Sequence, residues 1–294
     1  MNIFITGGTG LIGKSLVQLL KQKHQITILT RNVNNVENCD NVTYVSEFNE
    51  LDFSNFDAVI NLAGEPIVDK RWSDEQKDVL CHSRWDLTQD LVDKIDKAER
   101  TTPIRFISGS AVGYHGRQDH RPINESYNSP YPEFSHLLCQ RWEQIAQSAD
   151  NASIAILRTG IVLSPQGGAL KKMLLPFKLG GGGPIASGLQ MMPWIHIDDM
   201  VNGIIFLLDN PTLEGPFHLT APEPVTNKEF SQTLAKTLHR PCLLPMPEFV
   251  LRFAMGEMAD LLVYGQNAIP QRLLDTGFAF QYPKLKGALE ELLT

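Results

Sequence analysis

The chain begins with the sequence MNIFITGGTGLIG (residues 1–13), and this stretch decides the fold. Its apolar start predicts a buried strand, and apolar residues at helical spacing over residues 11–20 predict a helix. A glycine-rich turn between a strand and a helix is the setting of a phosphate-binding loop. We expect Gly7 to make the turn, Gly10 to let backbone N–H groups approach a pyrophosphate, and Gly13 to let the helix pack closely. The N-terminus of this helix adds partial positive charge for the anion.

The second expected strand indicates which dinucleotide binds. Residues 25–30 (QITILT) read as this strand, and its end falls where a dinucleotide fold meets the adenosine ribose. An NAD-binding protein usually has Asp or Glu there, which accepts from the 2′-hydroxyl. This chain has Arg31, whose guanidinium cannot accept but can pair with a 2′-phosphate through two donors. A solvated surface arginine is the alternative. The sequence favours NADP (NADPH) as the cofactor over NAD.

The composition is typical of a soluble cytoplasmic enzyme. A length of 294 residues accommodates one large α/β domain and a smaller one. The net charge of −7 disfavours binding to nucleic acid or to an anionic membrane. The 4 cysteines form no CxxC pair, which argues against a disulfide framework and a zinc site. We expect no leader peptide, because the first residues already form a strand, and no membrane span.

Strands and helices alternate along the chain up to about residue 165. Further strands are expected at 42–45, 57–62, 104–107 and 154–157, and helices after the N-cap Ser73 and at 134–149. Right-handed crossovers between such units build a doubly wound parallel sheet, so the predicted fold class is α/β of Rossmann type.

After Ser164, loops rich in glycine and proline replace this alternation, and only short helices are expected. We assign residues 1–164 to an NADP-binding Rossmann domain, to which residues 194–221 return. Residues 165–294 are assigned to a smaller, mainly helical C-terminal lobe. The lobe is expected to cover the carboxyl ends of the strands, because open α/β sheets bind ligands there.

Several short segments carry a family resemblance. They are TGGTGLIG at 6–13, NLAG at 61–64, SGSAVGY at 108–114, RTGIV at 158–162 and WIHIDD at 194–199. With these segments the chain resembles the extended short-chain dehydrogenase/reductases, the NAD(P)-dependent epimerase/dehydratase superfamily. The tail, at 244–247, 256–258 and 277–280, resembles the C-terminal domain of unknown function of an atypical epimerase-like subgroup.

The resemblance implies a cofactor site and a small carbonyl, alcohol or sugar-nucleotide substrate. Together with Arg31, the residues that it places against the cofactor are Gly7, Thr9, Gly10, Leu11, Ile12, Gly13, Leu62, Ala63, Gly64, Arg84, Ser108 and Thr159. Arg84 could instead be a solvated arginine on its helix.

The chain departs from the superfamily at the catalytic pair. Redox members use a Tyr four residues before a Lys on the helix after the fifth strand, and the ammonium lowers the pKa of the phenol. The matching positions hold Ser135 and Cys139, which provide neither a phenolate nor a cation. A Tyr-x-x-x-Lys string at Tyr282 and Lys286 lies far from that helix, and we interpret it as coincidence.

Three residues remain as candidate catalytic groups. Ser110 occupies the superfamily's catalytic serine position, or it satisfies a hydrogen bond of its own. Tyr114 could replace the missing phenol, although packing is the stronger interpretation. Cys139 could exchange a proton or attack a substrate, or it could simply pack in the helix interface.

The remaining polar motifs are expected to be structural. His196 and Asp198 precede a helix that Asp198 or Asp199 would cap. The 8 histidines lack metal-binding spacing, and the tryptophans are scattered, so no metal site or nucleic-acid stacking surface is expected.

Two functions are compatible with these residues. One is an NADP-dependent oxidoreductase or epimerase, favoured by the glycine loop and a whole substrate-side lobe. The other is a non-catalytic NADP(H)-binding sensor or regulatory module that has lost the Tyr–Lys pair. The retained lobe favours the enzyme.

Overall fold

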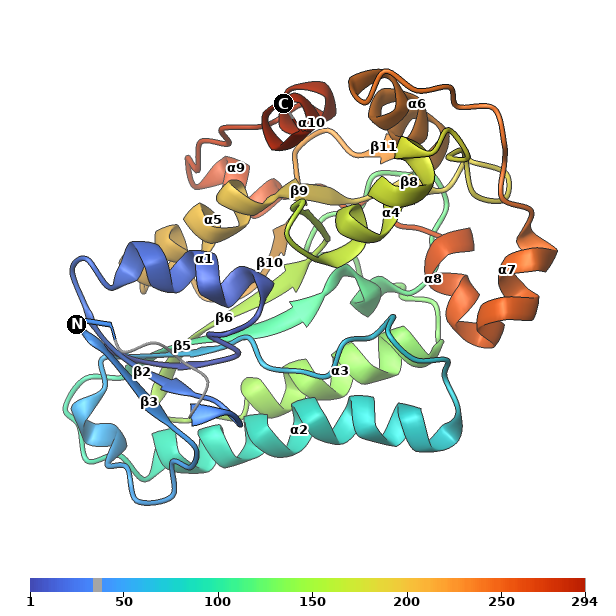
Figure 1. Cartoon of the computed structure of the whole chain (residues 1–294). Coiled ribbons are helices and arrows are strands. Elements are labelled where there is room, and N and C mark those ends of the chain that lie inside the picture. The colour runs from blue at the N-terminus through green and yellow to red at the C-terminus, as the bar shows by residue number, and fades with distance from the viewer. Residues whose placement is uncertain (34–38, 294) are drawn as a thin grey trace.

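The computed structural model describes residues 1–33 and 39–293, and within them a seven-stranded parallel sheet forms the centre of the molecule (Figure 1). Its strand order is β10-β6-β5-β4-β1-β2-β3, and each neighbouring pair is parallel. The strands are β1 (Asn2–Thr6), β2 (Gln25–Leu29), β3 (Val42–Val45), β4 (Ala58–Asn61), β5 (Ile104–Ala111), β6 (Ala152–Thr159) and β10 (Gly215–Leu219). The direction of winding reverses between β1 and β4, which is where ligands of doubly wound sheets bind. The predicted fold class is confirmed.

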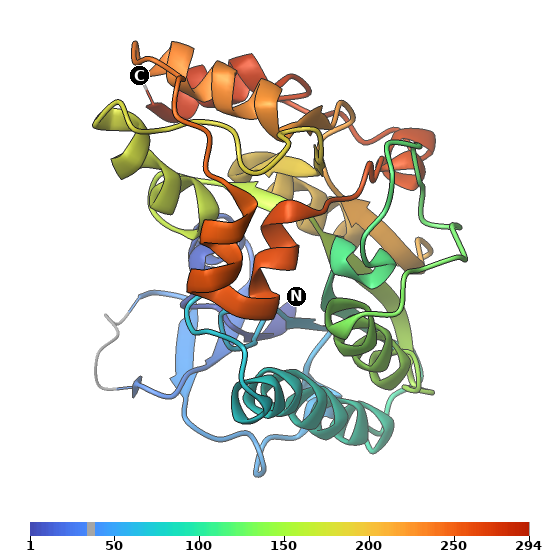
Figure 2. The same ribbon diagram turned by 90° about the vertical axis from the view of Figure 1, so that its right-hand side faces the viewer.

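Helices cover both faces of the sheet because its strands are apolar on both sides. In β1, Ile3 and Ile5 pack into one core, and Phe4 packs into the core on the opposite face. The helices of the first core are α1 (Leu11–Leu20) and α5 (Ile197–Asp209), and those of the second are α2 (Asp74–Asp96) and α3 (Phe134–Ala146) (Figures 1 and 2).

The strand expected at 104–107 is longer than its apolar run suggests. It continues to Ala111, because its second half pairs with β6 up to Thr159. Ser108 and Ser110 therefore lie inside a buried strand, and the turn that follows, η3 (Val112–His115), brings the chain to the carboxyl edge of the sheet.

The cap of α5 differs from the expectation. His196, not Asp198 or Asp199, is the N-cap, and its Nδ1 accepts the Asp198 N–H at 3.0 Å. Asp199 is fully buried and accepts the N–H groups of Gln281 and Tyr282. Its carboxylate thus ties the C-terminal segment to α5.

The part of the chain after residue 160 is built from short elements around a third core. This core includes Leu170, Trp194, Phe230 and Leu289. The elements are β7 (Ile161–Leu163), α4 (Gly168–Lys178), β8 (Met191–Met192), β9 (Trp194–His196), β11 (Val225–Thr226), α6 (Asn227–Thr237), α7 (Glu248–Met255), η4 (Gly256–Ala259), α8 (Asp260–Val263), α9 (Gln271–Asp275) and α10 (Leu285–Leu293).

Within this region β10 re-enters the central sheet as an edge strand. Figure 2 shows α7 and α8, in orange, between the α2–α3 layer and α6. An ion pair from Lys77 of α2 to Glu257 of η4 joins this segment to the sheet domain. No helix among the described residues is both long and apolar enough to cross a membrane.

Candidate functional site

The glycine turn between β1 and α1 has the geometry that its sequence predicts. Gly7 has φ +71°, and a Cβ there would lie 2.6 Å from the backbone carbonyl carbon of Leu62. A Cβ on Gly13 would lie 2.6 Å from the Cα of Gly8, so the helix can approach the turn only without a side chain at this position. Gly7 is therefore restricted to glycine by the backbone that follows β4, and Gly13 is restricted to glycine by the turn itself.

The N-terminus of α1 is open to an anion. Gly10 is its N-cap and supplies no capping side chain, and the first turn holds no acidic residue. The first amides of a helix have no partner within the helix, and the helix dipole makes this end positive. These features suit a phosphate group.

A groove of about 530 Å³ runs past this turn and is here called the glycine-loop groove. Of the predicted residues it is lined by Gly7, Thr9, Gly10, Arg31, Leu62, Ala63 and Gly64, and Thr6, Leu29, Thr30, Asn32, Glu65, Pro66, Ser83 and Leu87 complete it. Arg31 is exposed at one end. The groove therefore brings the glycine turn, the loop after β4 and the arginine after β2 together.

Other predicted cofactor residues lie beside this groove. Leu11, Ile12 and Gly13 form the first turn of α1, and Ser108 is fully buried in β5. Arg84 donates to the carbonyls of Glu65 and Leu80, and its guanidinium lies 5.3 Å from the Trp142 ring centre. Arg84 thus holds the loop after β4 in place.

A buried hydrogen-bond chain fixes the ends of β1 and β4. Thr6 donates to Asn61 at 2.6 Å, and Asn61 donates to Thr88 of α2 at 2.9 Å. Trp142 of α3 donates to the same Thr88 hydroxyl, which itself donates to the Arg84 carbonyl. This chain fixes the position from which residues 62–64 enter the groove.

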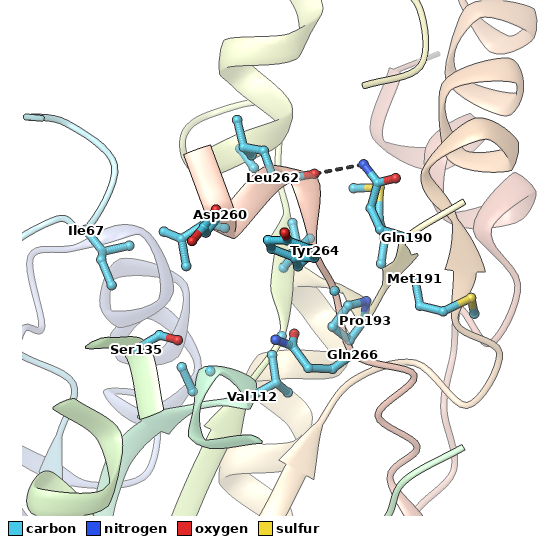
Figure 3. Close-up of a pocket in the computed structure, with 18 of the residues that line it drawn as sticks. Ile67, Val112, Ser135, Gln190, Met191, Pro193, Asp260, Leu262, Tyr264 and Gln266 are labelled. Carbon is cyan, nitrogen blue, oxygen red and sulfur yellow. Dashed lines mark hydrogen bonds between the residues drawn. The ribbon is translucent and has the colours of Figure 1, made fainter. Parts of the chain in front are cut away.

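A second cavity, of about 250 Å³, opens at the carboxyl ends of β5 and β6 (Figure 3). We call it the β5–β6 cavity. Its walls are Ile67, Val68, Ala111, Val112, Gly113, Glu133, Ser135, Cys139, Thr159, Gly160, Ile161, Ala169, Met173, Ile185, Gln190, Met191, Met192, Pro193, Asn227, Asp260, Leu261, Leu262, Tyr264, Gly265 and Gln266. The sheet supplies one side of it and the C-terminal lobe the other.

The two residues at the superfamily's Tyr and Lys positions both line this cavity. The Ser135 hydroxyl donates to Glu133 at 3.0 Å. Burial, followed by the nearby Glu143 carboxylate, raises the pKa of the Cys139 thiol to about 11. Cys139 is therefore a neutral thiol near pH 7, and its environment does not generate the thiolate that a nucleophile requires.

Ser110 and Tyr114 lie outside the walls of this cavity, unlike the expectation for catalytic groups. The Ser110 hydroxyl donates to Glu143 at 2.7 Å, and Glu143 forms a buried two-bond ion pair with Arg158. The Arg158 guanidinium lies 3.5 Å from the Tyr114 ring centre. Both residues thus contact the buried Glu143–Arg158 ion pair and do not line the cavity.

Sequence reasoning missed a charged cluster at the mouth of the cavity. Arg117 donates to Glu133 at 2.8 Å and to Asp260 at 2.9 Å, and its guanidinium lies over the Tyr264 ring. Asp260 and Tyr264 are more than a hundred residues from Arg117 in the chain, so no local motif could have revealed the contact.

Comparison with known protein families shows to which of them this chain is related. Residues 3–219 match the model of the NAD dependent epimerase/dehydratase family. The chain belongs to this family. Residues 246–292 also match a domain of unknown function, DUF1731. The resemblance drawn from the sequence motifs is confirmed, for the tail as well as for the first part of the chain.

Members of the family resemble the chain over its length. The epimerase family protein YfhF of Bacillus subtilis (strain 168) is 36% identical over 301 residues, which cover 100% of this chain and 98% of that protein. The crystal structure of human epimerase family protein SDR39U1 (isoform 2) with NADPH has a TM-score of 0.91 at 34% identity and 99% coverage of both chains. A nucleoside-diphosphate sugar epimerase from Corynebacterium glutamicum has a TM-score of 0.78 at 26% identity, over 100% of this chain and 58% of that one.

Proposed function

We propose that this member of the epimerase/dehydratase family is an NADP(H)-dependent oxidoreductase or epimerase acting on a small molecule. The observation that carries the proposal is the continuity of the two cavities along one segment. Residues 62–66 line the glycine-loop groove, and Ile67 and Val68 line the β5–β6 cavity. A dinucleotide held by its pyrophosphate in the groove therefore has a substrate-sized cavity next to it.

The residues that line the glycine-loop groove are suited to binding a dinucleotide. The uncapped N-terminus of α1, with Gly10, Leu11 and Ile12, offers backbone amides to a pyrophosphate. Residues 62–64 form the facing wall, and Thr159 lines the neighbouring cavity. Arg84 supports the loop after β4 through its bond to the Glu65 carbonyl, and Ser108 lies beside Asn61, the last residue of β4, in the sheet. When bound, the nicotinamide supplies hydride exchange with a substrate carbon.

Arg31 is the residue that we assign to the choice of cofactor. Arg31 lies on the groove wall between Thr30 and Asn32. None of these groove residues at the end of β2 is Asp or Glu. A guanidinium there complements a 2′-phosphate through charge-assisted hydrogen bonds. The solved structure of human SDR39U1, which holds NADPH, supports NADP(H) as the cofactor.

We also propose the division of the chain into two domains. Residues 1–164 and 194–221 would form the cofactor-binding domain, and residues 165–294 the lobe that closes the substrate side. The cavity walls support it, since Ala111 and Thr159 come from the sheet and Gln190 and Tyr264 from the lobe.

The β5–β6 cavity favours the enzyme, because an apolar cavity with a few convergent polar groups beside the cofactor groove is the usual form of a substrate site. Isothermal titration with NADPH and NADH, followed by NADPH oxidation against a panel of carbonyl compounds, tests both parts. Tight NADPH binding with turnover of a panel member is the expected result. Binding without any turnover would favour the sensor or regulatory module.

A further inference from the structure

One wall of the β5–β6 cavity is polar, and most of the remaining wall is apolar. The polar wall consists of Glu133, Ser135, Asp260 and Tyr264, from the start of α3 and from α8 with its following residue. The other walls are mainly Ile, Val, Leu and Met side chains. Figure 3 shows the Ser135 hydroxyl pointing into the space between α3 and the Tyr264 ring.

The carboxylates of the polar wall are already neutralised. Arg117 pairs with both Glu133 and Asp260, and Arg252 pairs with the second oxygen of Asp260 at 2.9 Å. Each carboxylate therefore has a guanidinium partner on the protein side. The wall presents hydrogen-bonding atoms to the cavity without a free charge.

The amide side chains that line the cavity already form hydrogen bonds within the protein. Gln190 donates to the carbonyls of Ile185 and Leu262, as the dashed line to Leu262 in Figure 3 shows in part. Gln266 donates to the Gly116 carbonyl, and Asn227 accepts the Ile185 N–H. Ser135 and Tyr264 are then the hydroxyl groups best placed to contact a ligand from the polar wall.

The walls of the cavity carry no cationic side chain that would pair with a phosphate. None of its wall residues, all of which lie in the described part of the chain, is Lys, Arg or His. A diphosphate placed there would lose its water without gaining a cationic partner, which is strongly unfavourable. An uncharged ligand avoids this penalty and gains from the apolar walls.

We propose, building on the NADP(H)-dependent function above, that the polar wall binds the oxygen of an uncharged, largely apolar carbonyl compound or alcohol. Ser135 and Tyr264 contact this oxygen, and Arg117 is a positioning residue that holds Glu133 and Asp260. The Ser135 hydroxyl donates to a side-chain oxygen of Glu133, so the Ser135 oxygen accepts from a substrate hydroxyl. The Tyr264 phenol, stacked on Arg117 at 4.1 Å, can donate to a carbonyl.

Ligand-observed saturation-transfer NMR on the full chain with NADP⁺ tests the class of ligand. Cyclohexanol should give a saturation signal, and UDP-glucose should give none. Ala169 lines the cavity, so Ala169→Phe should fill it and abolish the cyclohexanol signal while the affinity for NADP⁺ stays within about twofold. A UDP-glucose signal that Ala169→Phe removes, or no cyclohexanol signal from protein that binds NADP⁺, would overturn the inference. Failure to bind NADP⁺ would instead count against the proposed function.

A matched pair of tyrosine variants tests the polar wall. Tyr131 also lies against Arg117, at 4.6 Å, but it does not line the cavity. With NADP⁺ and a panel of uncharged cyclic secondary alcohols as substrates, Tyr264→Phe and Ser135→Ala should each lower kcat by about 10²-fold, the scale of a lost acid/base contact. Each should also weaken the cyclohexanol saturation signal, and Tyr131→Phe should change neither measurement. Equal effects of Tyr264→Phe and Tyr131→Phe would overturn the assignment.

Discussion

The hydroxyl of Ser110 donates a 2.7 Å hydrogen bond to the buried carboxylate of Glu143. Glu143 also accepts two bonds from Arg158, so the three residues form one buried hydrogen-bonded cluster that joins β5, α3 and β6. Ser110, which aligns with a catalytic serine in the superfamily, therefore donates its hydroxyl hydrogen to another side chain of the protein.

The first prediction concerns the stability that this bond provides. Ser110→Ala removes one of the two donors to Glu143 Oε1, and Arg158 still donates to that oxygen. The loss of a hydrogen bond to a charged group costs about 1.5–3 kcal/mol of unfolding free energy. Urea unfolding followed by circular dichroism measures it. The exposed Ser129→Ala is the control and should stay within about 0.5 kcal/mol of the parent. If Ser110→Ala instead kept full stability and lost turnover, the hydroxyl would face substrate.

The second prediction concerns the contact of Gly13 with the glycine turn. Gly13→Ala places a methyl group inside the contact distance of Gly8 and the Gly7 carbonyl, so the turn must shift and NADPH affinity should fall at least tenfold, about 1.4 kcal/mol. Isothermal titration measures the affinity. Gly287, in α10, has open space where a Cβ would stand, so Gly287→Ala should leave affinity unchanged and stabilise the fold by about 0.4–1 kcal/mol. Equal affinities for the two variants would refute the role of Gly13.

Local patterns predicted the parts of the site that depend on contiguous residues. The glycine turn, the loop at residues 62–64 and Arg31 each follow a strand, and parallel strands bring their carboxyl ends to one edge. The Ser73 cap of α2 could also be predicted, because the capping pattern lies within four consecutive residues, 73–76.

The parts that depend on packing between distant segments could not be predicted. Arg117 meets Asp260 and Tyr264 only after the C-terminal lobe folds over the sheet. In the same way, nothing near Ser110 in the sequence indicates that Glu143 will take its hydrogen bond, because that contact depends on how α3 packs on β5.

The third prediction uses a buried histidine pair. His115 and His218 share a 2.8 Å bond between their Nε2 atoms, and His218 Nδ1 donates to the Ile269 carbonyl. His115 must therefore donate its Nε2–H, which leaves its Nδ1 an acceptor without a partner among the described residues. Burial, and then the neighbouring His218, lowers the pKa of His115 to about 2; burial lowers the pKa of His218 to about 4.

The sign of the resulting pH dependence follows from these lowered values. The unfolded histidines bind protons near pH 6.5 and the folded ones do not, so stability is fully present above pH 6.5 and falls as the pH drops. The slope approaches about 1.4 kcal/mol per pH unit for each histidine. Urea unfolding between pH 7.5 and 5.5 measures it. By NMR the rings of His115 and His218 should not titrate in this range. Titration of either buried ring would contradict the prediction.

The last prediction is that Arg31 determines the preference for NADPH over NADH. Arg31→Asp removes a charge-assisted pair with the 2′-phosphate and places an anion against it, so NADPH affinity should fall by about ten- to a hundredfold, or 1.4–2.8 kcal/mol. NADH affinity should be unchanged or improved, because a carboxylate can accept from the ribose hydroxyl. Isothermal titration of both cofactors measures the change. Arg141→Asp makes the same charge change on an exposed face of α3, away from the groove, and should leave the preference intact. Equal affinity of the unaltered protein for the two cofactors would show that Arg31 does not meet the phosphate.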